Sequence, residues 1–288
     1  MKVLIAYDGS EYSEAALLDL GLAGLPPDLD AFVVSVSERW LPPPSTEEVL
    51  EPGDDASHSR TVEDASGVAE RARQELTAAF PGWNISAVAY KGSPAEQILE
   101  KAEEWRPDLV VVGSQGHTAL GRFVIGSVSQ KVVTEAACSV RVVRRRPGDR
   151  ARPPRLLIGL DGSPQAQEAV RTVSERRWPE GTEVLILTIF DESLERSPHF
   201  DKELGRIDMV QWDAESILSA AGLTPSRLSL EGNPKRRIPD KAESWEADCI
   251  FVGRRGHGRL RRLMLGSVAS AVAARAYCSV EVCRAPRS

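Results

Sequence analysis

The sequence contains an imperfect internal repeat, and this feature constrains the fold more than any other. Residues 105–144 match residues 245–284 at 18 of 40 positions, with an offset of 140. Nearer the start of each half, residues 4–10 (LIAYDGS) recur as residues 157–163 (LIGLDGS) with an offset of 153. The first half therefore carries about 13 extra residues between these two anchors.

We place the extra residues within 39–60, a stretch rich in Pro and acidic residues. Residues 147–154 (PGDRARPP) have the composition of an exposed linker. A chain of 288 residues is long enough for two domains of ordinary size. The repeat therefore predicts one domain at residues 1–146, the linker at 147–154, and a second domain of similar design at residues 155–288.

Composition and charge exclude several classes of protein. With 42% hydrophobic residues, the bulk of the chain is expected to be globular. The formal net charge of −6 gives no global electrostatic reason to bind nucleic acid or an anionic membrane. No apolar stretch approaches the roughly 18 residues that cross a bilayer, and the 4 cysteines show no CxxC spacing that would favour a zinc site. We expect a soluble, cytoplasmic protein that contacts neither nucleic acid nor membrane.

Each half alternates short apolar runs with helical patterns. In the first half, strands are expected at residues 3–7, 31–36, 85–90, 109–112 and 140–143. Helices are expected between them, one capped by Ser10, one over residues 62–80, one beginning at Pro94 and one over residues 127–137. Continuous apolar strands alternating with amphipathic helices are typical of a parallel sheet covered on both faces. The predicted fold is α/β, with two tandem doubly wound domains, each a five-stranded parallel sheet with helices on both faces.

Glycine-rich motifs follow the strands, where ligands bind in open parallel sheets. The pattern is G-x-x-G, nine residues and then G-S before a helix, and it occurs twice, at Gly113, Gly116, Gly126 and Ser127, and at Gly253, Gly256, Gly266 and Ser267. Glycines at such turns let backbone N–H groups approach phosphate oxygens, and the helix start adds partial positive charge. A single copy could be two ordinary turn glycines, but two copies at the same spacing are more specific. Each serine could donate to a phosphate or cap its own helix.

These motifs resemble those of the universal stress protein family, in its ATP-binding branch. The similarity lies in residues 109–117 (LVVVGSQGH) with 126–128 (GSV), and in residues 249–257 (CIFVGRRGH) with 266–268 (GSV). It covers nearly the whole chain as two tandem family domains and implies an adenine nucleotide alpha hydrolase-like fold. The chain departs from the family pattern at Ser139 and Ser279, where the family usually has Pro before the fifth strand.

The resemblance implies ATP as the ligand, with Mg²⁺ held mainly by its phosphates. It places Asp8 and Asp161 beside the adenosine. It also implies that the glycine motifs and the residues after them bind the ribose and the phosphates. The remaining positions are Ala6 and Gly159 on the adenine side, Val36 and Ile189 at the adenine edge, and Val128 and Val268 after the serines. The family also pairs domains through their fifth strands, so residues 140–143 and 280–283 could form an internal pseudo-dimer, as a monomer or within a homodimer.

Other features leave two interpretations open. His117 and His257 could contact ribose or phosphate, or could be satisfied by backbone in their loops. Five arginines lie near the second glycine loop: Arg254, Arg255, Arg259, Arg261 and Arg262. They could clamp a triphosphate, which would make the two sites unequal, or they could form a solvated basic face. The stretch 39–60 could cover the first site as a lid or be an inert surface loop.

The leading hypothesis is an ATP-binding stress-response protein that acts as a nucleotide-dependent switch or interaction module, with a protein partner. The sequence has no GxSxG elbow and no Walker A motif, which argues against an α/β-hydrolase and a P-loop ATPase. We assign no catalytic residue and no metal-ligating cluster, since no positioned base or nucleophile can be identified from the motifs. A slow nucleotide hydrolase and a nucleotide-free scaffold remain as alternatives.

Overall fold

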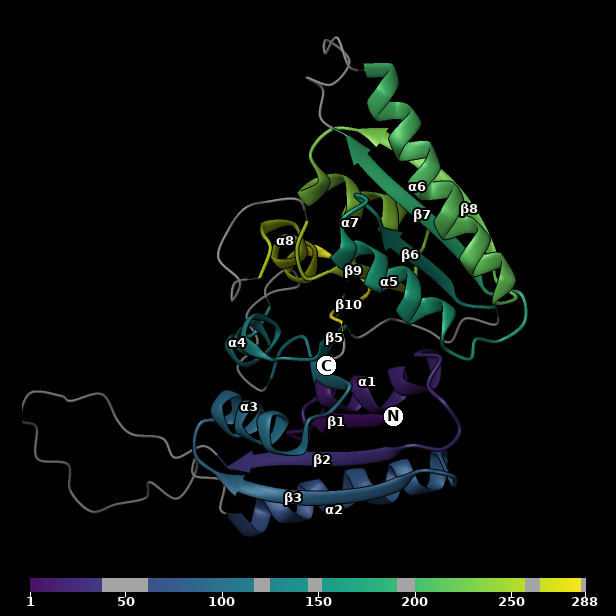
Figure 1. Ribbon diagram of the computed structural model, residues 1–288. Helices are drawn as coiled ribbons and strands as arrows, with labels where there is room; N and C mark the ends of the chain where they lie inside the picture. Colours follow the sequence, from purple (N-terminus) through teal and green to yellow (C-terminus); the bar gives the residue numbers. More distant parts are fainter. Residues whose placement is uncertain (38–61, 117–124, 145–151, 191–199, 257–264, 286–288) are drawn as a thin grey trace, which may run out of the picture.

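The computed structural model describes residues 1–37, 62–116, 125–144, 152–190, 200–256 and 265–285. Figure 1 shows the two halves of the chain stacked on each other, the first in purple to teal and the second in teal through green to yellow. The stretch 39–60, which we predicted to hold the extra residues of the first half, lies outside the described residues.

The two halves contain the same succession of elements. The first half consists of β1 (Lys2–Ala6), α1 (Glu11–Asp19), a 3-10 turn η1 (Leu20–Leu22), β2 (Asp30–Ser37), α2 (Val62–Ala79), β3 (Asn84–Lys91), α3 (Pro94–Trp105), β4 (Leu109–Gly113), α4 (Ser127–Glu135) and β5 (Ser139–Val143). The second consists of β6 (Arg155–Gly159), α5 (Pro164–Ser174), β7 (Glu183–Phe190), α6 (Phe200–Ala220), β8 (Thr224–Glu231), α7 (Pro234–Ser244), β9 (Cys249–Gly253), α8 (Ser267–Arg275) and β10 (Ser279–Cys283). Every strand predicted for the first half is present, with its ends shifted by one or two residues.

All ten strands join one sheet, in the order β3-β2-β1-β4-β5-β10-β9-β6-β7-β8. Among the strands that the structure describes, pairing is parallel within each half and antiparallel only between β5 and β10. The prediction of a five-stranded parallel sheet in each half is confirmed. The fifth strands pair within one chain, as the resemblance implied.

Alternate side chains of the central strands serve opposite faces of the sheet, as the two-residue period of a strand requires. Val3 and Ile5 of β1 pack with Leu76 of α2 in one apolar cluster. Leu4, between them, packs with Ile98 of α3 in another. Strands that are buried on both faces have continuous apolar sequences, which explains the runs that identified them.

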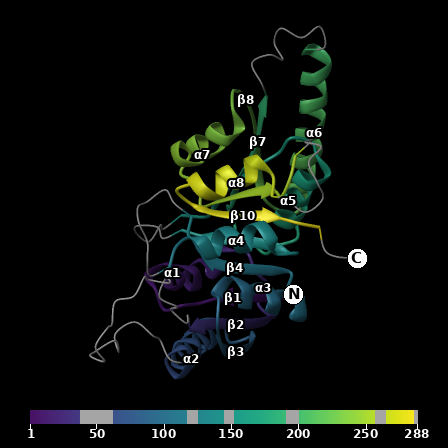
Figure 2. The same cartoon turned by 90° about the vertical axis from the view of Figure 1, so that its left-hand side faces the viewer.

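Helices α3, α4, α7 and α8 cover one face of the sheet, with α4 and α8 near the junction of the two halves (Figure 2). On this face a single apolar core crosses from one half to the other. Val132 of α4 and Val140 of β5 belong to the same cluster as Val272 of α8 and Val280 of β10. The hydrophobic effect therefore holds the halves together on this side, in addition to the β5–β10 hydrogen bonds.

On the opposite face, the halves meet through buried charges. Arg141 of β5 and Glu281 of β10 lie opposite each other in the strand pairing, and their side chains are 1% and 0% exposed. The Arg141 guanidinium donates to Asp19 at 2.5 Å and to Glu281 at 3.2 Å, while Arg176 donates to both Glu281 carboxylate oxygens. Burial opposes the charge of Arg141, but the neighbouring carboxylates outweigh it and raise its pKa. Since Arg141 and Glu281 are equivalent positions of the repeat, this strand pairing matches opposite charges only when the two different halves meet.

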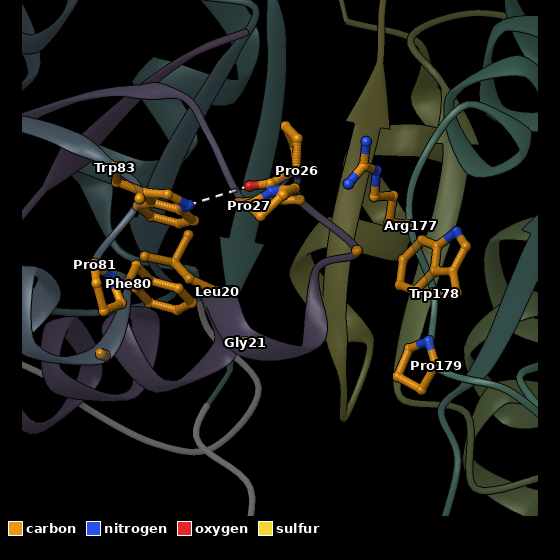
Figure 3. Close-up of a pocket in the computed structure, with 14 residues that line it drawn as sticks. Leu20, Gly21, Pro26, Pro27, Phe80, Pro81, Trp83, Arg177, Trp178 and Pro179 are labelled. Atoms are coloured by element: carbon orange, nitrogen blue, oxygen red, sulfur yellow. Dashed lines mark hydrogen bonds between the residues drawn. The ribbon is translucent and has the colours of Figure 1, made fainter.

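The halves also meet between the turn that follows α2 and the segment that follows α5. These segments line a cavity of about 560 Å³ (Figure 3). Its walls are mainly apolar, with Phe80 and Trp83 stacked at 4.0 Å on the first half and Trp178 on the second. Gly24 lies against Trp178: it has a φ of +64°, and a Cβ there would lie 2.8 Å from the indole. The Arg177 N–H donates to the Gly24 carbonyl at 2.9 Å, so this approach is fixed by the backbone.

We expect Gly24→Ala to reduce the free energy of unfolding by at least about 2 kcal/mol, because left-handed backbone and overpacking each cost about 1–3 kcal/mol. Gly21→Ala is the matched control, since a Cβ at Gly21 would meet nothing within 4 Å. Urea unfolding of both variants measures the difference. Equal stability of the two variants would show that the second half does not press on Gly24.

None of the helices in the described part of the chain combines the length and the apolar character that crossing a membrane requires.

Candidate functional site

The turn after β1 fixes a carboxylate at the carboxyl edge of the sheet. Asp8 Oδ1 accepts from the Ser10 N–H at 2.9 Å, and Gly9 between them has a φ of +75°, which glycine adopts at little cost. Ser10 then caps α1 by accepting from the Ser13 N–H, which confirms its predicted role. The second half repeats this turn at the start of α5, with Asp161, Gly162, Ser163 and Ala166.

The glycines after β4 and β9 pack against these turns. A Cβ on Gly116 would lie 3.0 Å from Asp8 Oδ2, and a Cβ on Gly256 would lie 2.3 Å from Asp161 Oδ2. The first glycine of each pair is equally tight, since a Cβ on Gly253 would lie 2.4 Å from the backbone of Gln165. Each glycine loop therefore lies directly beside the carboxylate that follows the first strand of its half. Close contact with that carboxylate or with neighbouring backbone explains why these positions are Gly.

The starts of α4 and α8 lie next to the glycine loops. Gly126 is the N-cap of α4, and its N–H donates to the Ser114 carbonyl at 2.7 Å. Gly266 holds the same place in α8 and donates to the Arg254 carbonyl at 2.8 Å. Neither helix has a side-chain cap, and Ser127 is exposed at the first helical position. The N-cap of each helix is a glycine, so the alternative that the serines cap their own helices is wrong. Each helix start, which carries partial positive charge, lies next to the glycine loop of its half.

In the second half these parts surround a cavity of about 480 Å³ at the carboxyl edge of β6, β7 and β9. The predicted site residues of this half that the structure describes all line it: Gly159, Asp161, Ile189, Gly253, Gly256, Gly266, Ser267 and Val268. Apolar side chains form one wall, and Asp161, Arg255, Ser267 and Ser270 supply the polar side chains. The size and the lining are typical of a small-molecule site.

Sequence reasoning missed part of this lining. Leu187, Ile238 and Val252 contribute apolar wall, and Pro234 lines the cavity at the start of α7. One signal was available, because Pro234 follows β8 and parallel strands end at the same edge of a sheet. The apolar side chains could not be separated by pattern from ordinary core residues.

The first half places its predicted residues in the equivalent positions. Ala6 ends β1, and Val36 lies near the end of β2. Both pack with Val128 of α4 against the same apolar cluster, while Asp8 lies beside Gly116 as described above. His117 and His257 fall outside the described residues, so their predicted contacts stay predictions.

The two halves differ at the glycine loop. Arg255 lines the second cavity, where the first half has Gln115. Arg254, predicted as part of a phosphate clamp or of a solvated face, is not among the described residues that line the second cavity. Its guanidinium is partly buried and donates to the Thr134 carbonyl at the end of α4 at 2.7 Å, and burial, together with the nearby Arg255, lowers its pKa. The predicted partners Arg259, Arg261 and Arg262 lie outside the described residues.

Among the described residues, no three His, Cys, Asp or Glu side chains gather as metal ligands. Asp161 is the one carboxylate in the described lining of the second cavity. A Mg²⁺ ion here would depend on ligand phosphates and water for its coordination, which is how Mg²⁺ is commonly held.

The model of the universal stress protein family matches residues 1–144 and 154–284. The chain belongs to the universal stress protein family. A universal stress protein of Mycobacterium tuberculosis is 27% identical over 300 residues, covering 98% of this chain and 96% of that protein. One from Thermus aquaticus is 34% identical over 145 residues, covering 49% of this chain and 97% of the relative.

Solved structures agree with the fold of this universal stress protein. The crystal structure of a universal stress protein from Archaeoglobus fulgidus covers 98% of both chains with a TM-score of 0.67 at 23% identity. A putative universal stress protein from Pseudomonas aeruginosa covers 98% of this chain and 92% of its own, with a TM-score of 0.60 at 15% identity. At this level of identity the likeness establishes the tandem α/β architecture.

Proposed function

We propose that this universal stress protein binds an adenine nucleotide in each half, ATP with Mg²⁺, and acts as a nucleotide-dependent switch or interaction module. The observation that carries the proposal is the second-half cavity of about 480 Å³, where the glycine loop, the uncapped start of α8 and Asp161 meet. The turn geometry is repeated in the first half, with Asp8, Gly116 and Gly126 in the same relation.

The lining suits the three parts of a nucleotide. The apolar wall, including Ile189 and Val252, would bury the base. Asp161 would accept hydrogen bonds from the ribose hydroxyls. The first-turn N–H groups of α8, the Ser267 hydroxyl and the Arg255 guanidinium would bind the phosphates.

Binding is better supported than fast catalysis. The titratable side chains in the described lining are Asp161 and Arg255, and one oxygen of Asp161 already accepts from the Ser163 N–H. A nucleophile paired with a general base is absent from this part of the lining. A slow hydrolase would be recognised by its products, ADP or AMP.

We also propose that residues 1–146 and residues 155–288 form the two domains. The compartment that we propose is the cytoplasm, where ATP is abundant.

The test is to measure the nucleotide that the purified chain carries and then to titrate the stripped chain with Mg-ATP by calorimetry. We expect two ATP per chain, or one tightly held and a second that titrates. Accumulation of ADP or AMP would favour the slow hydrolase. No released nucleotide and no heat at millimolar Mg-ATP would overturn the proposal and leave the scaffold.

A further inference from the structure

The glycine loop of the second site reaches the helix of the first. Arg254 stands between the two loop glycines, and its backbone is fixed at both groups: its N–H donates to the Cys283 carbonyl at 3.1 Å, and its carbonyl accepts from the Gly266 N–H at 2.8 Å. Its side chain leaves the second half and donates to the Thr134 carbonyl in the last turn of α4. One residue therefore joins the second glycine loop to the helix whose first residue lies at the first site.

Among the described residues, a link that starts from the glycine loop exists in one direction only, although Arg144, which follows β5, donates to the Ala273 and Ala274 carbonyls of α8 at 2.8 Å. In the first half, Ser114 takes the place of Arg254 and makes the same backbone bonds, to the Val143 carbonyl and from the Gly126 N–H, both at 2.7 Å. A serine side chain is too short to reach the opposite helix α8. Of the two positions at which the loops differ, 114/254 and 115/255, the first is therefore the one that reaches the opposite half.

Helix α4 is suited to transmit a displacement. It has nine residues, so it spans about 13 Å, with Val132 and Val133 buried in the shared core. A packed helix moves as a unit, so a constraint at its last turn also constrains Gly126 and Ser127 at its start.

We infer that Arg254 is a positioning residue that couples the two nucleotide sites, so that occupancy of the second site raises the affinity of the first. The inference rests on the proposed function. A phosphate bound at the second glycine loop restricts the backbone that carries Arg254, holds the guanidinium against α4, and so reduces the ordering that the first site requires. By linkage, a nucleotide at the first site favours binding at the second by the same factor.

The test uses full-length chains with one site disabled. Ser127→Asp disables the first site and keeps the second able to bind, and Ser267→Asp does the reverse. Each substitution puts a carboxylate where a phosphate would bind. Calorimetry with Mg-ATP on these variants gives the two separate affinities, which together predict the isotherm of two independent sites. We expect the unmodified chain to bind more tightly than that prediction, by about 5-fold or more, and Arg254→Ser to restore independent binding without weakening either separate site.

Arg284→Ser is the matched control. Arg284 donates to the same end of α4, to the Val133 and Thr134 carbonyls at 3.3 and 3.4 Å, but it follows β10 and is not part of the glycine loop. It should leave the coupling in place. Loss of coupling in Arg284→Ser would overturn the inference, because the coupling would then depend on the cations at this helix end in general and not on the residue of the glycine loop.

The remaining outcomes are distinct. If the unmodified chain already binds as two independent sites, the coupling is refuted and the proposed function stands. If no variant binds Mg-ATP, both fail. If Arg254→Ser unfolds, Arg254→Lys keeps the cation but loses the forked donor, and its coupling is expected to fall below that of the unmodified chain; an unchanged value would refute the inference.

Discussion

Glu281→Gln is expected to lower the free energy of unfolding by about 3–5 kcal/mol, the cost of breaking a buried ion pair by removing one charge. The Glu281 side chain is fully buried, and its two oxygens accept from Arg176 at 2.5 and 2.9 Å, while Arg141 donates to it at 3.2 Å. An amide cannot accept from both guanidiniums in this way, because its nitrogen would face other donors. Arg141 would keep Asp19 as a carboxylate partner. Arg176, whose charge is paired with Glu281, would lose its carboxylate partner.

The comparison is with an ion pair of the same residue types at the surface. Glu168 and Arg171 of α5 are joined at 2.5 Å, with side chains 22% and 41% exposed. Water screens this pair, so Glu168→Gln should cost less than about 1 kcal/mol. Urea unfolding of both variants in the full chain gives the difference. Similar losses in the two variants would show that the charges between the halves are not desolvated as the structure places them.

The repeat and the apolar runs were enough to predict the strands, because strands buried on both faces leave a continuous signal. Helix ends were less certain: α4 ends at Glu135 rather than at residue 137, since Ala136 is already extended and leads into β5. The pairing of the halves came from the family resemblance. The charges that accompany it were missed, although Arg141 interrupts an apolar strand and Glu281 interrupts the equivalent one.

The backbone parts of the site could be predicted, and most of the side-chain parts could not. The glycines and the serine that follows them occur at a regular spacing, which can be recognised directly in the sequence. In contrast, Ile238 reaches the second cavity from a helix that follows another strand, and only the fold brings it there. Arg254 shows the same limit, because its partner Thr134 is 120 residues away in the sequence. Several arginines lie close together here, and the sequence does not indicate which side chain points away from the proposed ligand.

Ser127→Asp combined with Ser267→Asp is expected to abolish nucleotide binding while leaving the fold intact. Both serines are exposed at the first position of a nine-residue helix, where a carboxylate stabilises the helix by about 0.3–1 kcal/mol. The same carboxylate would stand beside the phosphates, and two like charges at about 4 Å repel by about 4 kcal/mol where the effective dielectric constant is near 20. Affinity at each site should therefore fall at least about 100-fold, since each 1.4 kcal/mol is a factor of ten.

The single substitutions should each remove one binding event from the calorimetric titration with Mg-ATP. Ser127→Ala and Ser267→Ala are the controls: they remove a hydroxyl but add no charge, so the backbone N–H groups of the helix starts still bind phosphate and the loss should stay below about tenfold. Thermal unfolding should rank the Asp variants as stable as the unmodified chain or slightly more so. Two undiminished binding events in the double Asp variant would place the phosphates elsewhere, because each site would then tolerate a new carboxylate at the helix start that is proposed to bind its phosphates.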